Sequence, residues 1–241
     1  MIYVMSVIHG CYQEYKAMLK KINFSSSDVL FILGDVIDRG PKGFHILLDM
    51  MRRRNVIPLM GNHEYVALST LAEGVDLDSD PKNHNNSIEF RCWYADGGKS
   101  TIEKFRNLEP VHRRWIIEYM KKFQFYKKIT VNGRKFFLVH AGISDFEPNK
   151  PLEEYQKENF LYERMHYDEQ SYFEDTTIIS GHTPTFLIDD NSAGKIYHHK
   201  NHIVIDCGIA YGGSLACLCL NTMEEFYVYK IDQTTVYSGR E

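Results

Sequence analysis

Two short segments decide the fold of this chain: GDVIDRG at residues 34–40 and GNHE at residues 61–64. Each follows an apolar run, VLFIL at 29–33 and VIPLM at 56–60, although Pro58 weakens the second run as a strand. Short apolar runs bounded by glycine predict buried strands, and the segment between them is long enough for a crossover helix. In such α/β units the loops at the carboxyl ends of the strands carry the chemistry. We therefore interpret both polar segments as parts of one functional site rather than as two unrelated glycine turns.

The N-terminal residues predict a first buried strand over residues 2–8 that leads to His9. Val7 suits this interpretation because β-branched residues favour strands. Helical spacing of apolar residues predicts a helix over residues 14–22 and another over residues 44–53. The second of these helices is the expected crossover between the two decisive segments.

Strand patterns return in the second half of the chain. Strands over 127–131 and 135–139 flank Asn132-Gly133, a pair that favours the type I′ turn of a β-hairpin. The hairpin leads to His140, and a later strand over 177–180 leads to His182. Further strands are expected at 203–206, 215–220 and 225–231.

Between the two sets of strands, residues 65–125 predict a helical cap inserted into a single domain that spans residues 1–241. Residues 73–87 are polar and rich in Asp, Asn, Ser and Pro, which is typical of an exposed loop. The aromatic residues Phe90, Trp93 and Tyr94 could stack on a nucleobase, but we interpret them as the core of the cap.

The composition is that of an ordinary soluble protein, with 44% hydrophobic and 25% charged residues. A formal net charge of -4 argues against dedicated nucleic-acid binding, which uses a basic face. No apolar run approaches the length of a membrane span, so no membrane partner is expected. The five cysteines are odd in number and none has CxxC spacing, which favours a reducing cytoplasm.

Several apolar runs end in a residue that can bind a metal ion: His9, Asp35, Asn62, His140 and His182. This set of imidazole, carboxylate and amide donors, without a thiolate, suits Mn²⁺, Fe or Zn²⁺ rather than a structural cysteine zinc site. A carboxylate such as Asp35 can bridge two ions, and a pair of ions about 3.5–4 Å apart can activate a water and hold phosphate oxygens.

The order of these motifs resembles the phosphoprotein phosphatase family of calcineurin-like metallophosphoesterases. The matching motifs are His-Gly, Gly-Asp-x-x-Asp-Arg-Gly, Gly-Asn-His-Glu, His-Ala-Gly and Gly-His-Thr, and the similarity spans nearly the full chain. It is greatest to the bacterial and phage branch, which includes the diadenosine tetraphosphatases. The resemblance implies an α/β fold of two mixed β-sheets packed as a sandwich, with helices outside and the site at the strand ends.

The resemblance also implies two divalent ions, with Mn²⁺ preferred over Fe, Zn²⁺ or Mg²⁺. His9 and Asp35 would bind the first ion. Asp35 would bridge to the second ion, which Asn62, His140 and His182 would complete.

Four further residues receive catalytic roles by the same resemblance. His63 would be the general acid that protonates the leaving group, and Asp38 would hold its imidazolium. Arg39 and Arg164 would clamp phosphate oxygens, a task that suits a planar guanidinium.

One departure from the family pattern stands at Val7. The family begins Asp-x-His-Gly, whereas this chain reads Val7-Ile8-His9-Gly10, and valine has no donor atom. We therefore expect the first metal position to be under-occupied while the second is retained.

Three functions remain open from the sequence. The first is hydrolysis of phosphoserine, phosphothreonine or phosphotyrosine in proteins by a metal-activated water. The second is hydrolysis of dinucleoside polyphosphates such as diadenosine tetraphosphate by the same groups. The third, supported by Val7 alone, is a catalytically impaired protein that binds phosphorylated ligands.

Overall fold

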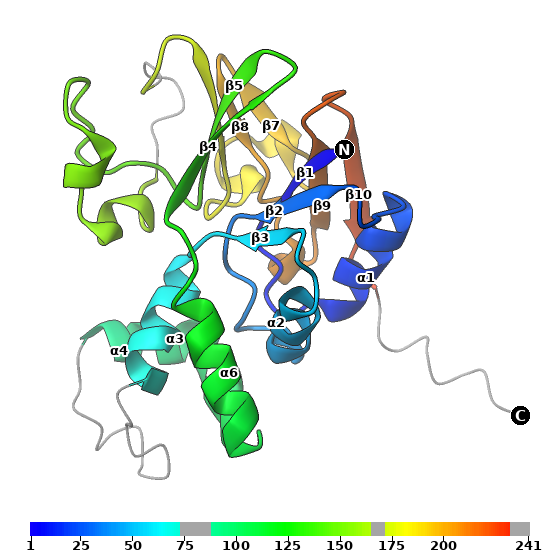
Figure 1. Cartoon of the computed structure of the whole chain (residues 1–241), viewed down its shortest axis with the longest axis vertical. Coiled ribbons are helices and arrows are strands. Elements are labelled where there is room, and N and C mark those ends of the chain that lie inside the picture. Colours follow the sequence, from blue (N-terminus) through cyan, green and yellow to red (C-terminus); the bar gives the residue numbers. More distant parts are fainter. Residues whose placement is uncertain (73–87, 165–171, 232–241) are drawn as a thin grey trace, which may run out of the picture.

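The computed structural model describes residues 1–72, 88–164 and 172–231, and its strands form two five-stranded mixed sheets (Figure 1). The first sheet has the order β10-β9-β1-β2-β3, and the second has the order β4-β5-β6-β8-β7. The strands are β1 Ile2–Met5, β2 Val29–Ile32, β3 Val56–Pro58, β4 Tyr126–Val131, β5 Arg134–Val139, β6 Thr176–Ser180, β7 Tyr197–His199, β8 His202–Val204, β9 Ser214–Cys219 and β10 Glu225–Tyr229.

The helices separate or cover these strands. They are α1 Tyr12–Lys21, α2 Gly43–Met51, α3 Asn62–Ala72, α4 Ile88–Trp93, α5 Lys99–Arg106 and α6 Pro110–Met120, with a distorted turn, η1 Tyr94–Gly98, between α4 and α5. Short 3-10 turns are η2 Leu152–Glu154, η3 Lys157–Phe160, η4 Thr185–Leu187, η5 Asp190–Ser192 and η6 Ile209–Tyr211. In the described ranges, no helix is both long and apolar enough to cross a membrane.

The first sheet is parallel where the decisive segments emerge from it. β1 pairs with β2 and β2 pairs with β3 in parallel register, with α1 and α2 as the crossovers, as the sequence predicts. The two predicted C-terminal strands are present as β9 and β10, which extend the sheet in antiparallel register on the other side of β1. Both ends of the described chain therefore lie in one sheet.

The second sheet begins with the predicted hairpin. Asn132 and Gly133 join β4 to β5 with φ angles of 49° and 78°, the two positive values that a type I′ turn needs. β5, β6 and β8 are then parallel. The carboxyl ends of β5 and β6, which precede His140 and His182, therefore lie at one edge of the sheet.

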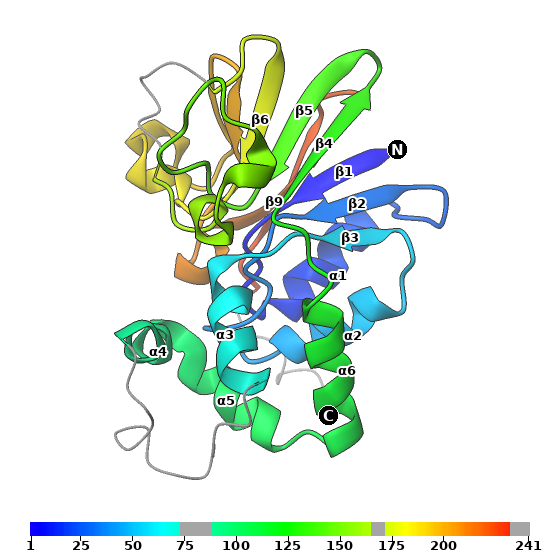
Figure 2. The same ribbon diagram turned by 60° about the vertical axis from the view of Figure 1, so that its left-hand side comes forward.

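The two sheets pack face to face, because alternate residues of each strand point to opposite faces. Val4 and Phe31 lie in an apolar cluster between the sheets with Phe136 and Ile179 of the second sheet. On the outer face of the first sheet, residues such as Met5 pack against α1, α2 and the helices between β3 and β4. This arrangement confirms the expected α/β sandwich with helices outside (Figure 2).

Helices α3 to α6 occupy most of the region from 65 to 125 that the sequence identifies as an inserted cap. They share one apolar cluster with the outer face of the first sheet, and Phe90 and Trp93 are buried in it. The polar loop expected over 73–87 lies outside the described residues. That the helices form a cap with a role of its own stays a prediction.

The first strand is shorter than predicted. β1 ends at Met5 rather than Ile8, because Val7 has a φ angle of 51° and leaves the extended conformation. The N–H groups of Ile8 and His9 both donate to the Asp35 carbonyl at 2.8 Å. Val7 is thus not a strand residue, and the predicted role of its β-branched side chain in a strand is wrong.

Candidate metal centre

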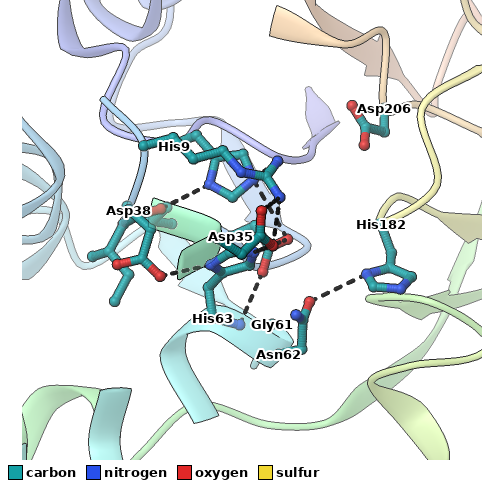
Figure 3. Close-up of polar contacts among 12 residues, drawn as sticks. His9, Asp35, Asp38, Gly61, Asn62, His63, His182 and Asp206 are labelled. Atoms are coloured by element: carbon teal, nitrogen blue, oxygen red, sulfur yellow. Dashed lines mark hydrogen bonds and ion pairs between the residues drawn. The ribbon is translucent and has the colours of Figure 1, made fainter. Parts of the chain in front are cut away.

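Side chains from both sheets meet where the strands end (Figure 3). His9 follows β1, Asp35 follows β2, and Asn62 and His63 begin α3 directly after β3. From the second sheet come His140 after β5 and His182 after β6. The structure therefore places together the five metal ligands expected from the sequence.

The second metal position has a complete set of donors. Ligand atoms of Asp35, His140 and His182 lie within 4.8 Å of one another, and Asn62 Oδ1 lies 2.9 Å from His140 Nε2 and 3.2 Å from His182 Nδ1. His140 donates from Nδ1 to the Leu33 carbonyl at 2.6 Å, which leaves the Nε2 lone pair directed at the cluster. The four side chains of this position all offer lone pairs and none is a cationic lysine or arginine, so together they suit a divalent ion.

The electrostatics of this position favour a neutral His182 beside an ionised Asp35. Burial, helped by His140, lowers the pKa of His182 to about 3. Burial alone would raise the pKa of Asp35, but His140, His63, His9 and His182 outweigh it and hold the pKa of that carboxyl below its ordinary value. An ionised Asp35 with neutral imidazoles is the state that binds a metal ion.

The first metal position fits less well. Ligand atoms of His9, Asp35 and His63 lie within 4.8 Å of one another, but Val7, two residues before His9, is a buried side chain without a donor atom. His9 donates from Nδ1 to the Ile37 carbonyl at 2.8 Å, so its Nε2 faces the site, 3.8 Å from Asp35 Oδ2. Burial lowers the pKa of His9 to about 3, which keeps the ring neutral.

His63 and Asp38, which the sequence predicts to be a proton pair, are joined by a hydrogen bond; their catalytic role stays a prediction. Nδ1 of His63 donates to Oδ2 of Asp38 at 2.6 Å, and Nε2 faces the metal cluster at 4.0 Å from Asp35 Oδ2. Burial would lower the pKa of His63, but the carboxylates of Asp35 and Asp38 outweigh it and raise the pKa to about 9. His63 is therefore protonated at neutral pH and can act as an acid.

Two residues that the sequence did not single out for this role support Asp38. The indole Nε1 of Trp93 donates to Oδ2 of Asp38 at 2.5 Å, and the Thr101 hydroxyl donates to Oδ1. Trp93 is a core residue, as predicted, but it also carries a buried donor. Helices between β3 and β4 thus complete the hydrogen bonding of the proton pair.

Glu64 fixes the loop that carries Asp35. Its two carboxylate oxygens accept hydrogen bonds from the backbone N–H groups of Asp35, Val36, Ile37 and Gly61 at 2.7–3.2 Å. The side chain is fully buried. The last residue of GNHE therefore connects the two decisive segments directly.

The two predicted phosphate-binding arginines differ in their surroundings. Arg39 donates from Nη2 to both oxygens of Asp96 at 3.0 and 2.9 Å, and from Nη1 to His9 Nε2 at 2.9 Å. Its guanidinium also lies 5.0 Å from the centre of the Tyr211 ring. Arg164 is exposed, and its charge contributes to lowering the pKa of His182. The role of both arginines as a phosphate clamp stays a prediction.

Asp206 is a further buried carboxylate beside the site (Figure 3). It follows β8 and accepts a hydrogen bond from the Gly208 N–H at 3.0 Å. Burial, helped by Asp35, raises the pKa of Asp206 to about 7. The sequence contained a signal for it, since a single Asp follows the apolar run 203–205.

The backbone around the site is strained. Eleven non-glycine residues in the described ranges have a positive φ angle, and six of them belong to the site: Val7, His9, Asp35, Asp38, Arg39 and His182. Such conformations cost about 1–3 kcal/mol each and gather at functional sites, where the surrounding structure holds them.

Comparison with known proteins agrees with this geometry. A symmetrical bis(5'-nucleosyl)-tetraphosphatase of Buchnera aphidicola subsp. Schizaphis graminum is 34% identical over 146 residues, which cover 59% of this chain and 45% of that protein. A protein of the same name from Wigglesworthia glossinidia brevipalpis is 45% identical over 64 residues, which cover 26% of this chain and 24% of that protein. The matches thus span less than half the length of these relatives.

Solved structures share the fold at low sequence identity. A yeast protein serine/threonine phosphatase with similarity to human phosphatase PP5 has a TM-score of 0.56 at 12% identity, over 96% of this chain and 80% of that chain. A provisionally assigned diadenosine tetraphosphatase has a TM-score of 0.65 at 16% identity, over 96% of this chain and 94% of that chain. The family model described as calcineurin-like phosphoesterase matches residues 1–219. This chain therefore belongs to the calcineurin-like phosphoesterases.

Proposed function

We propose that this chain is a metal-dependent hydrolase of dinucleoside polyphosphates such as diadenosine tetraphosphate. The observation that carries the proposal is the protonated His63, held by Asp38 with its Nε2 facing the Asp35 cluster. The names of the curated relatives, symmetrical bis(5'-nucleosyl)-tetraphosphatases, favour this substrate over a phosphoprotein.

The side chains have separable roles in this reaction. A divalent ion, for which we propose Mn²⁺, supplies Lewis-acid activation of water and phosphate when bound at Asp35, Asn62, His140 and His182. His63 donates its Nε2 proton to the leaving phosphate oxygen. Asp38 holds the ring so that Nε2 points to the site, and it stabilises the charge before transfer.

The surroundings of the site suit this role. Arg39 and Arg164 bring positive charge to the side on which phosphate would bind, which supports the proposed clamp. All five cysteines are free, in keeping with our proposal of a reducing cytoplasmic location.

The test is a side-by-side assay of diadenosine tetraphosphate and a phosphoserine peptide with Mn²⁺ added. We expect kcat/KM to be at least about tenfold higher for the dinucleotide, because fixed polyphosphate and base contacts contribute binding energy that a short peptide lacks. A His63→Asn variant should lose about 10²–10⁴-fold in kcat, the usual contribution of a general acid.

The other outcomes of this assay have definite meanings. Faster turnover of the phosphopeptide would contradict the proposed substrate and favour the phosphoprotein alternative. Binding of either ligand without turnover, unchanged in His63→Asn, would identify the chain as an impaired phospho-ligand-binding protein.

A further inference from the structure

The guanidinium of Arg39 lies at the first metal position. We propose that Arg39 is the resident cation of that position, so that the chain binds one divalent ion, at Asp35, Asn62, His140 and His182. The inference concerns the metal complement and goes beyond the proposed function, since it does not depend on which phosphate ester is hydrolysed.

The first step in the argument is the lone pair of His9. Its Nδ1 donates to the Ile37 carbonyl at 2.8 Å, so Nε2 is an acceptor, and Arg39 Nη1 donates to it at 2.9 Å. A metal ion would need this same lone pair. One lone pair cannot serve both partners, so an ion at the first position must displace the guanidinium.

The second step is that Arg39 is held in place by other contacts. Both oxygens of Asp96 accept from Nη2, and the Tyr211 ring lies beside the guanidinium at 5.0 Å. Asp96 reaches this position because Gly97, with a φ angle of 110°, lets its turn lie against the Arg39 backbone: a Cβ on Gly97 would be 2.8 Å from the Arg39 nitrogen. Moving Arg39 therefore costs a bidentate ion pair.

The third step is charge. With Val7 in place of an aspartate, Asp35 is the one carboxylate in either group of potential metal ligands among the described residues. The carboxylate of Asp38 is already occupied, because it accepts hydrogen bonds from His63 and Trp93. Two dications that share Asp35 as their one carboxylate ligand would repel each other strongly, whereas one dication and one guanidinium carry less charge. The absence of a carboxylate at residue 7 therefore agrees with a guanidinium, rather than a second dication, beside His9.

The backbone at Val7 supports this account. A φ angle of 51° is unfavourable for a β-branched residue but tolerated by Asp and Asn. The conformation thus suits the aspartate that the family pattern expects at residue 7. A Val7→Asp variant should consequently fit the backbone, with Val7→Asn as a control of the same shape and no charge.

The experiment measures bound Mn²⁺ after saturation and removal of free metal, together with the electron paramagnetic resonance spectrum. We expect about one Mn²⁺ per chain and an uncoupled spectrum, because exchange coupling needs two ions about 3.5–4 Å apart. Arg39→Met should bind a second equivalent, more weakly than the first. The double variant Val7→Asp with Arg39→Met should bind two tightly, with a coupled spectrum.

The controls separate the guanidinium from general loss of charge. Arg53→Met removes another arginine that is paired with a carboxylate, that of Asp49, and should leave the metal count at one. Val7→Asn should also bind one ion. Two coupled ions in the unchanged chain would overturn the proposal, and so would a single ion in Arg39→Met when Val7→Asp alone binds two. Neither result would decide the substrate, which the turnover assay tests separately.

Discussion

At the scale of single residues, Asp38 connects the chemistry to the rest of the fold. Its carboxylate accepts hydrogen bonds from His63, Trp93 and Thr101, and only the first of these belongs to the motifs that the sequence displays. Trp93 and Thr101 come from helices between β3 and β4. The geometry of the proposed general acid, His63, therefore depends on a region whose contribution the motifs did not reveal.

We predict that Asp38→Asn moves the alkaline limit of kcat/KM to lower pH. The pKa of His63 is raised to about 9, so the acid form is present below that pH and is lost as the pH rises through it. Removing one of the two carboxylates that raise this pKa should bring it down toward 6.5. A pH profile of kcat/KM measures the shift.

The control for this profile is Asp49→Asn, which removes a carboxylate that is paired with Arg53 and is not among the main groups that shift the pKa of His63. It should leave the alkaline limit in place. An alkaline limit that does not move in Asp38→Asn would show that His63 is not the group that titrates.

At the scale of elements, the sequence predicted most of the strands and helices correctly. Buried strands and amphipathic helices have periodic apolar patterns. The Asn132-Gly133 pair favours a type I′ turn, and both residues have the positive φ angles of that turn. The end of β1 was misplaced because a β-branched Val7 favours a strand locally, while hydrogen bonds to the Asp35 carbonyl impose a turn. The residue types around Val7 cannot reveal hydrogen bonds to Asp35, which is 28 residues further along the chain.

The same distinction applies to the candidate site. The grouping of the proposed metal ligands could be predicted because each follows a strand and a shared edge brings strand ends together. The contact of Asp96 with Arg39 could not, since it joins residues 57 positions apart through an irregular turn. An ion pair between two distant loops leaves no periodic pattern in the sequence from which it could be predicted.

We predict that Glu64→Gln destabilises the loop after β2 and costs about 2–3 kcal/mol of the free energy of unfolding, a typical cost of leaving buried hydrogen-bonding groups without partners. The carboxylate accepts four backbone N–H groups, and an amide would place its own N–H₂ against some of them. Urea unfolding in the presence of a chelator measures the change.

Glu118→Gln on α6 is the matched control for this substitution, since Glu118 is exposed and pairs with Lys121 at the surface. It should change the free energy of unfolding by less than about 0.5 kcal/mol. Equal effects in the two variants would contradict the clamping role of Glu64.

At the scale of the whole molecule, the second metal position joins the two sheets. Asp35 and Asn62 follow strands of the first sheet, and His140 and His182 follow strands of the second. An ion bound to all four therefore holds the two layers of the sandwich together at one edge. Its binding free energy becomes part of the free energy of folding, because the unfolded chain lacks the site.

We predict that Mn²⁺ at about 100 times its Kd stabilises the chain by about 2.7 kcal/mol. For a chain of this size that corresponds to a rise of roughly 5–10 °C in Tm. Asn62→Ala and His182→Ala should each abolish most of the rise, although they belong to different sheets. Thermal unfolding with and without Mn²⁺ measures it.

His112→Ala on α6 is the control, since this histidine lies outside the clusters of possible ligands in the described ranges. It should keep the full rise in Tm. If His182→Ala kept the rise while Asn62→Ala lost it, the ion would be bound by the first sheet alone.

The presence of both ends of the described chain in one sheet has a consequence for biosynthesis. Among the described strands β1 leaves the ribosome first, but its neighbour β9, and β10 after it, are made only after all five strands of the second sheet. The nascent chain cannot complete its first sheet, or support His9 and Asp35 with it, until residues 214–229 have been made. Metal binding at the proposed site, where it depends on the complete first sheet, therefore follows synthesis of the second sheet.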